Sequence, residues 1–292
     1  MGDQASRRLF SRIAFVRLIA FIFVLGIVYG GGEYALAYVA HHLVPKPFVG
    51  AVALGGTALT SLVAIGLYVL LVRWLERRRP RELALARGVP LLIGGFALAA
   101  LMFTTVYAAL WGLGDATWRG VAGYAGVESL AAMAIGSGVG EELLFRGGVF
   151  RILEDSLGTG LALILSGALF GALHLANPHA TFYSAAAIAL EAGVMLGAAY
   201  AATRNLWLPI GIHIGWNFTE GGVFGAAVSG NGAGRGIFDV PLSGPPLISG
   251  GEFGPEASII TVAVCSLVGL FFIVRTVRRG RWVPLSCHLM LD

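Results

Sequence analysis

The chain has 292 residues, of which 57% are hydrophobic and only 12% are charged, and its mean hydropathy is +0.81. A soluble domain of this length carries about 25% charged residues, so the composition excludes an ordinary soluble protein and predicts an integral membrane protein. The formal net charge is only +4, and the two cysteines indicate neither a disulfide framework nor a thiolate metal site.

Apolar runs of roughly 18–25 residues predict eight transmembrane helices, because a helix of that length crosses about 30 Å of hydrocarbon. The sequence shows no internal repeat and no second domain. We therefore expect an all-α, polytopic membrane helix bundle that forms a single domain over residues 1–292. The predicted helices cover residues 12–32, 49–73, 90–112, 124–150, 159–176, 181–203, 206–226 and 257–276.

Arginines gather at alternate links between these helices, whereas the other links carry only Lys46, Arg119 and Arg235. By the positive-inside rule, this alternation predicts a multi-pass protein of the cell membrane with both termini in the cytoplasm. The Gly- and Pro-rich segment 227–256 is then external, and it is either flexible or folded over the mouth of a cavity. The arginines that define the pattern are Arg7, Arg8, Arg12, Arg17, Arg73, Arg77, Arg78, Arg79, Arg81, Arg87, Arg151, Arg204, Arg275, Arg278, Arg279 and Arg281.

The fourth predicted helix contains two adjacent carboxylates, Glu141 and Glu142, followed by Arg146. A charge at the bilayer centre costs several kcal/mol, so such groups are functional candidates by default. Glu142 and Arg146 are four residues apart and are expected to form a buried ion pair. Glu141 points about 100° away and remains uncommitted. The alternative is that all three groups only hold helices together or cap the helix at the inner interface.

Two further predicted helices carry His174 and the pair His213 and Asn217. His174 alone is more typical of helix packing, and the pair His213 and Asn217 alone fits an interhelical hydrogen-bond face equally well. Together with a carboxylate, they are the groups needed to hydrolyse an amide bond. The carboxylate takes a proton from water, one imidazole orients that water or protonates the leaving amine, and the amide and second imidazole hold the oxyanion. Helical rise places His174 about 24 Å deep, against roughly 10–16 Å for the others, so its helix is expected to be displaced or tilted.

Other polar features of the predicted helices have simpler interpretations. The glycine-rich segment 136–140, which contains Ser137, is expected to allow close helix packing. Most of the remaining intramembrane carboxylates are expected to serve helix packing or to lie at the interface. These are Glu33, Glu128, Glu191 and Glu220.

The motifs EELLFRG, FGALH and HIGWN resemble the EExxxR, FxxxH and HxxxN motifs of the CAAX protease and bacteriocin-processing (CPBP, Abi) family of intramembrane endopeptidases. That family includes the type II CAAX prenyl endopeptidases. The resemblance covers about residues 124–220, which is then the catalytic core. It implies an endopeptidase that acts on a membrane-associated or prenylated-type peptide.

The resemblance also implies residue roles. Glu141 would activate the water with His174, and His213 and Asn217 would bind the oxyanion. Glu142 and Arg146 would support them. The resemblance further implies that no metal is required; the alternative is a zinc ion held by Glu141, His174 and His213. The expected partners are a peptide or protein substrate and membrane lipid, and not nucleic acid.

Two other function classes remain open. Buried Glu, His and Arg side chains also serve proton-coupled transporters, although the sequence shows no inverted repeat. A catalytically silent scaffold or immunity protein could keep the same fold. The absence of an HExxH sequence argues against a zinc protease of the site-2 type. Cleavage of a peptide with and without Glu141→Gln separates the enzyme from both alternatives.

Overall fold

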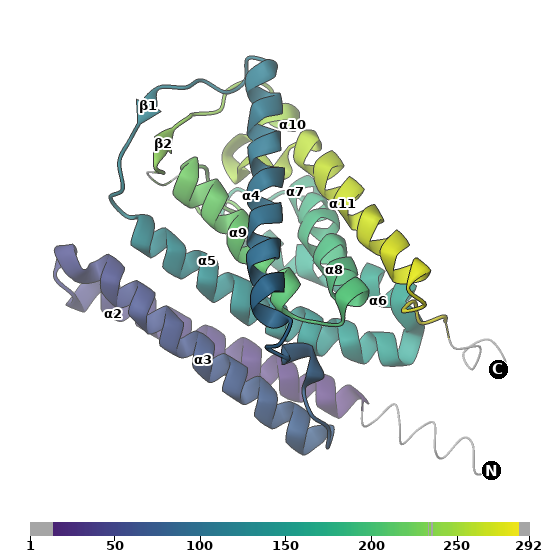
Figure 1. Cartoon of the computed structure of the whole chain (residues 1–292). Coiled ribbons are helices and arrows are strands. Elements are labelled where there is room, and N and C mark those ends of the chain that lie inside the picture. The colour runs from purple at the N-terminus through teal and green to yellow at the C-terminus, as the bar shows by residue number, and fades with distance from the viewer. Residues whose placement is uncertain (1–13, 233, 235, 286–292) are drawn as a thin grey trace, which may run out of the picture.

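Helices account for nearly all regular structure in residues 14–232, 234 and 236–285, the part of the chain that the computed structural model describes (Figure 1). The predicted all-α bundle is thus confirmed. Arg7, Arg8, Arg12 and Arg235 lie outside the described residues. The α-helices are α2 (Gly30–Leu43), α3 (Val49–Leu75), α4 (Gly88–Gly112), α5 (Val127–Glu142), α6 (Arg151–Leu173), α7 (Phe182–Ile188), α8 (Met195–Thr203), α9 (Trp207–Asn217), α10 (Pro246–Ser249) and α11 (Ile259–Arg278).

Shorter elements interrupt or extend these helices. The π-helical stretches are η1 (Ile22–Tyr29), η4 (Leu143–Phe150), η6 (Ala189–Val194) and η7 (Phe218–Val223). The 3-10 turns are η2 (Lys46–Phe48), η3 (Arg81–Leu83), η5 (His174–Ala176), η8 (Gly251–Phe253) and η9 (Pro255–Ala257). Two short antiparallel strands, β1 (Gly120–Val121) and β2 (Phe238–Asp239), pair at the end of the bundle where the segment 227–256 lies.

Within the described residues, six helices are long and apolar enough to cross a membrane: Ala14–Leu43, Lys46–Leu75, Gly88–Gly112, Val127–Ala176, Phe182–Thr203 and Ile259–Arg278. The boundary expected between the fourth and fifth spans is helical apart from Gly158, where the chain turns (φ 76°, ψ 168°). A Cβ atom at position 158 would lie 2.7 Å from Pro284 O. The expected seventh span corresponds to the shorter run formed by α9 and η7.

Glycines let α4 and α9 pack backbone to backbone. A Cβ at Gly95 of α4 would lie 2.5 Å from Leu208 O, and one at Gly211 of α9 would collide with Leu92 O. Small residues at such positions drive close helix association in lipid. The contact fixes α9 in the interior of the bundle, behind α4 in the view of Figure 1.

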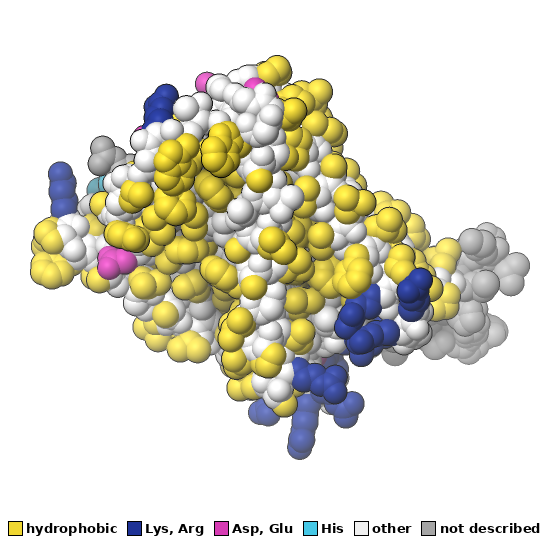
Figure 2. Space-filling view, turned by 45° about the horizontal axis from the view of Figure 1, so that its top comes forward, with side chains coloured by type: hydrophobic (Ala, Val, Ile, Leu, Met, Phe, Trp, Pro, Cys, Tyr) yellow, Lys and Arg dark blue, Asp and Glu magenta, His cyan; other side chains and the backbone are white. Residues whose placement is uncertain are grey.

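Ion pairs tie several helices together at the arginine-rich end of the bundle. Glu76, directly after α3, accepts from Arg17 and Arg151 (both 2.6 Å). Arg78 pairs with Glu82 (2.7 Å). Burial raises the pKa of Glu82, but hydrogen bonds from Arg78 and other donors outweigh it, so the pKa lies below its ordinary value. Figure 2 shows most of the visible Lys and Arg side chains gathered at this end, beside a flank rich in exposed hydrophobic side chains.

The first residues of the segment 227–256 line a cavity. Val228, Ser229 and Asn231 line that cavity. Further along, β2 pairs with β1, and Ala116 and Leu242 form an isolated bridge. Residues from the described part of this segment therefore form part of the wall of the site described next.

Candidate active site

Four side chains predicted from three separate motifs line one cavity of about 380 Å³: Glu141, His174, His213 and Asn217. α5 provides the carboxylate, the 3-10 turn η5 at the end of α6 provides the first histidine, and α9 provides the other two groups. His174 thus reaches the same cavity as Glu141 despite its deeper position by helical counting. A cavity of this size lies in the range of small ligand sites.

The glycines before Glu141 bring α5 against its neighbours, as expected. A Cβ at Gly140 would collide with the ring of Tyr29, and one at Gly138 would lie 2.5 Å from the Ile214 side chain. Directly after Glu142 the helix widens into the π-helical stretch η4. Such stretches inside α-helices are frequent at functional sites. The sequence pattern predicted an uninterrupted α-helix here and missed this change.

The expected ion pair between Glu142 and Arg146 is confirmed. Arg146 Nη1 donates to Glu142 Oε1 (2.7 Å), and both side chains are buried, with 2% and 0% exposed. Arg146 Nη2 also donates to the carbonyls of Ala192 and Gly193 in η6. Its guanidinium lies 4.7 Å from the centre of the Phe170 ring. The pair therefore joins the helix of the two carboxylates to η6 and α6.

A contact that the sequence did not predict connects this pair to the third motif. His213 Nδ1 lies 2.9 Å from Glu142 Oε1, so the carboxylate contacts both Arg146 and His213. Since a carboxylate that pairs with a guanidinium accepts hydrogen bonds, the Nδ1 of His213 carries the proton. Glu142 therefore sets the orientation of one of the candidate catalytic side chains.

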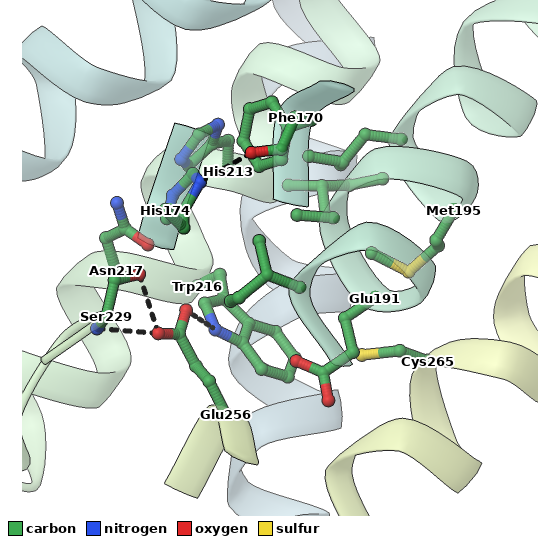
Figure 3. A pocket seen from close by; sticks show the side chains of 14 residues that line it. Phe170, His174, Glu191, Met195, His213, Trp216, Asn217, Ser229, Glu256 and Cys265 are labelled. Carbon is green, nitrogen blue, oxygen red and sulfur yellow. Dashed lines mark hydrogen bonds between the residues drawn. The ribbon is translucent and has the colours of Figure 1, made fainter. Parts of the chain in front are cut away.

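The second histidine is oriented in the same way. His174 Nδ1 lies 2.8 Å from Phe170 O, four residues earlier in α6. A carbonyl only accepts hydrogen bonds, so Nδ1 is again the protonated nitrogen. In both histidines the Nε2 atom is left for a water or a substrate. Both histidines also line the pocket that Figure 3 shows.

Ser137 holds the amide of Asn217. Asn217 Nδ2 donates to Ser137 Oγ (2.8 Å), and Ser137 Oγ donates in turn to Met133 O (3.0 Å). One of the two amide hydrogens of Asn217 is thereby used, and the other is left for a ligand. The sequence interpretation assigned the Ser137 segment to helix packing alone; no local signal revealed its contact with α9.

Two further cavities adjoin the site. A groove of about 960 Å³ with a largely apolar lining runs between α2, α3 and α5. Ser137, Glu141 and Asn231 line both this groove and the cavity of about 380 Å³ that contains the four candidate catalytic side chains. On the other side, a narrow space of about 30 Å³ extends from the two histidines toward Glu191 and Glu256 (Figure 3). Its size is sufficient for a water molecule.

The inner space contains carboxyl groups that the sequence interpretation assigned to packing or did not single out. Glu191 is 3% exposed, and its Oε1 has no hydrogen-bond partner among the described residues. Glu220 does not line this space, but its side chain is fully buried, and no hydrogen bond to either of its carboxylate oxygens occurs among the described residues. Glu256 accepts hydrogen bonds from Trp216 and Ser229.

The candidate zinc ligands are not arranged as a metal site. Among residues 14–232, 234 and 236–285, no group of three or more His, Cys, Asp or Glu side chains is placed to hold a metal ion. The alternative set of Glu141, His174 and His213 lines the cavity without forming such a group.

A membrane-embedded helix bundle with a carboxylate, two imidazoles and an amide around one cavity has the constitution of an intramembrane protease. Residues 123–219 match the family model described as type II CAAX prenyl endopeptidase Rce1-like, which confirms the resemblance of the three motifs over about a third of the chain. The family is one of CAAX-type intramembrane proteases. Comparison with curated proteins and with solved structures gives no significant match.

Proposed function

We propose that this chain is an intramembrane endopeptidase of the cell membrane that hydrolyses a peptide bond in a membrane-associated or prenylated-type peptide. The observation that carries the proposal is the convergence of Glu141, His174, His213 and Asn217 on one cavity. Three elements far apart in sequence each contribute polar groups that an inert bundle in lipid would avoid.

In the proposed reaction, a water molecule lies between Glu141 and the Nε2 atom of His174. Glu141 takes a proton from the water while the water oxygen bonds to the carbonyl carbon of the peptide. The carbonyl oxygen becomes an oxyanion. The C–N bond then breaks, and the proton held by Glu141 passes to the leaving nitrogen. The products are a carboxylic acid and an amine, and protein groups alone carry every proton.

The proposed oxyanion donors are Asn217 and His213. Ser137 occupies one amide hydrogen of Asn217, which leaves the other for the oxyanion. The Nδ1–H of His213 is engaged by Glu142, so Nε2 can donate only if the ring carries a second proton. The adjacent carboxylate of Glu142 stabilises that imidazolium. Glu142 and Arg146 are thus positioning residues for the donor pair.

The apolar groove that shares Glu141 supports an amphipathic substrate. Leu25, Leu36 and Leu144 are among the side chains that line it, so an apolar or lipidated side chain could lie there while the peptide bond reaches the polar cavity. A substrate peptide and membrane lipid are therefore the proposed partners, and nucleic acid is not one of them.

The test is cleavage of an internally quenched peptide ending in a prenylated Cys-aliphatic-aliphatic-X sequence by the purified chain in liposomes. Glu141→Gln and His174→Ala should abolish cleavage in folded protein. Asn217→Ala should lower kcat by about 10²–10³-fold, the usual loss for one oxyanion donor. Glu128→Gln, an exposed carboxylate on the same helix as Glu141, is the matched control and should cleave normally.

Three outcomes would contradict the proposal. Cleavage that survives both Glu141→Gln and His174→Ala would contradict the catalytic roles assigned to these two residues. Loss of cleavage with a strong chelator and its recovery with zinc would replace the metal-free mechanism. Proton-coupled flux across the liposome without any cleavage would favour a carrier.

A further inference from the structure

One buried carboxylate connects two walls of the narrow space of about 30 Å³ beside the two histidines. Glu256 lies in η9, directly before α11, and only 5% of it is exposed. Its Oε1 accepts a hydrogen bond from Trp216 Nε1 (3.1 Å). Its Oε2 accepts from both the backbone N–H and the Oγ of Ser229 (2.6 and 2.7 Å). Figure 3 shows this carboxylate between the two partners. Three donors from two segments distant in sequence thus converge on one side chain.

The first partner belongs to the helix of the proposed oxyanion donors. Trp216 lies on α9 directly before Asn217 and three residues after His213. Its indole is 7% exposed and packs edge-on against Phe103 of α4, with 4.9 Å between ring centres. The hydrogen bond to Glu256 therefore fixes the rotation of α9 at the level of the donors.

The second partner, Ser229, connects Glu256 to the turn that carries His174. The carbonyl of Ser229 accepts a hydrogen bond from Asn177 Nδ2 (3.0 Å). The backbone N–H of Asn177 donates to the carbonyl of His174 (3.1 Å). One continuous chain of hydrogen bonds therefore runs from α9 through Glu256 to the turn that carries His174.

The backbone of Ser229 indicates that this contact is imposed by its surroundings. Ser229 has φ 49°, in the left-handed region that residues with a Cβ rarely adopt. Such a conformation persists only where neighbouring contacts hold it, and it is most common at functional sites. Here Glu256 binds both the N–H and the hydroxyl of Ser229. A Cβ at the next residue, Gly230, would collide with Pro178 O, which shows how closely this turn packs on the end of α6.

The backbone around Glu256 is held by close contacts and hydrogen bonds. Gly254 has φ 113° and lies so close to Ala227 O that a side chain would collide with it. The carbonyl of Pro255 accepts from Thr261 Oγ1 (2.6 Å), and Ser258 caps the first turn of α11. The start of α11 therefore presents Glu256 in one position.

We propose that Glu256 is a positioning residue, which holds Trp216 and Ser229 so that the oxyanion donors on α9 and His174 face one cavity. This inference rests on the proposed endopeptidase function. Glu256 lies outside the segment that matches the family model, which ends at residue 219.

The experiment compares Glu256→Gln, Trp216→Phe and Ser229→Ala in cleavage of the prenylated quenched peptide. A glutamine cannot accept hydrogen bonds on both sides, so kcat should fall by about 10- to 100-fold in Glu256→Gln, with KM within about twofold. Trp216→Phe removes one donor and should lower kcat by about tenfold. Ser229→Ala keeps the backbone donor and should have the smallest effect. Glu252→Gln, in the same loop with its side chain 84% exposed, is the control and should retain the parental kcat.

A second measurement separates positioning from binding. In the Glu141→Gln background, the affinity for the same peptide should be unchanged by Glu256→Gln within about twofold. Parental kcat in folded Glu256→Gln, or a loss confined to KM, would overturn the positioning role. If Glu256→Gln does not fold, parental kcat in both Trp216→Phe and Ser229→Ala overturns it. Normal cleavage by Glu141→Gln would instead reject the proposed function itself.

Discussion

Replacing Arg146 by methionine tests whether the buried ion pair organises the proposed site. Methionine keeps an unbranched apolar stem but removes the charge that pairs with Glu142 at 2.7 Å. It also removes the donor to the carbonyls of Ala192 and Gly193. Among the described residues, the Glu142 carboxylate, 0% exposed, would then keep only His213 as a side-chain partner. Breaking a buried pair by removing one partner costs about 3–5 kcal/mol.

A second substitution, at Glu142, tests whether the loss of stability in Arg146→Met comes from the buried carboxylate that has lost its cationic partner. In Glu142→Gln/Arg146→Met the charge at position 142 is removed together with its cationic partner, and the glutamine Oε1 can still accept from His213. The double variant should therefore be more stable than Arg146→Met alone, by about 1–3 kcal/mol, the usual penalty for an unsatisfied buried group. Unfolding free energies of parent, single and double variants in detergent complete the thermodynamic cycle.

Activity and stability should separate in this series. The double variant should fold but cleave the prenylated peptide poorly, because the neutral glutamine no longer stabilises a positively charged His213 ring. Parental stability of Arg146→Met, or a double variant that is no more stable than Arg146→Met alone, would refute the reasoning.

Three further predictions follow from contacts around the site and at the arginine-rich end. Gly140→Ala should destabilise the fold by about 1–3 kcal/mol, because its Cβ would collide with the ring of Tyr29. Ser137→Ala should lower kcat by about tenfold with little loss of stability, since it removes the acceptor that orients the Asn217 amide. Unfolding as a function of pH should show an acid-side loss from Glu82: because its folded-state pKa is lowered, its stabilising contribution is complete above the unfolded value of about 4.3 and is lost as the pH falls through the folded-state value.

Each of these has a matched control. Gly66→Ala, at a helical glycine of α3 with open space around its Cβ, should be neutral or stabilising, and equal destabilisation at both glycines would contradict the contact with Tyr29. Ser137→Thr, which keeps the hydroxyl, should retain more activity than Ser137→Ala. Arg78→Gln removes the guanidinium, whose two hydrogen bonds lower the pKa of Glu82. An unchanged loss of stability at acid pH in that variant would show that other groups cause the loss.

Composition and local spacing were enough to determine the class of fold and the identity of the candidate groups. Apolar length predicts helices because lipid leaves backbone groups no partner outside their own segment. The pairing of Glu142 with Arg146 was predictable because a four-residue interval on a helix is a local geometry. Such signals depend on neighbours in the sequence and need no knowledge of packing.

Only the tertiary structure decided how these groups work together. The contact of Glu142 with His213 spans 71 residues, and that of Asn217 with Ser137 spans 80. Both depend on the register at which α5 and α9 pack, which close approaches at glycines fix and which no local pattern encodes. The junction of Glu256 with Trp216 and Ser229 was likewise invisible, because it needs the loop to close over the bundle. Helix periodicity specifies which side chains share a face, whereas the partner of that face is selected by packing in three dimensions.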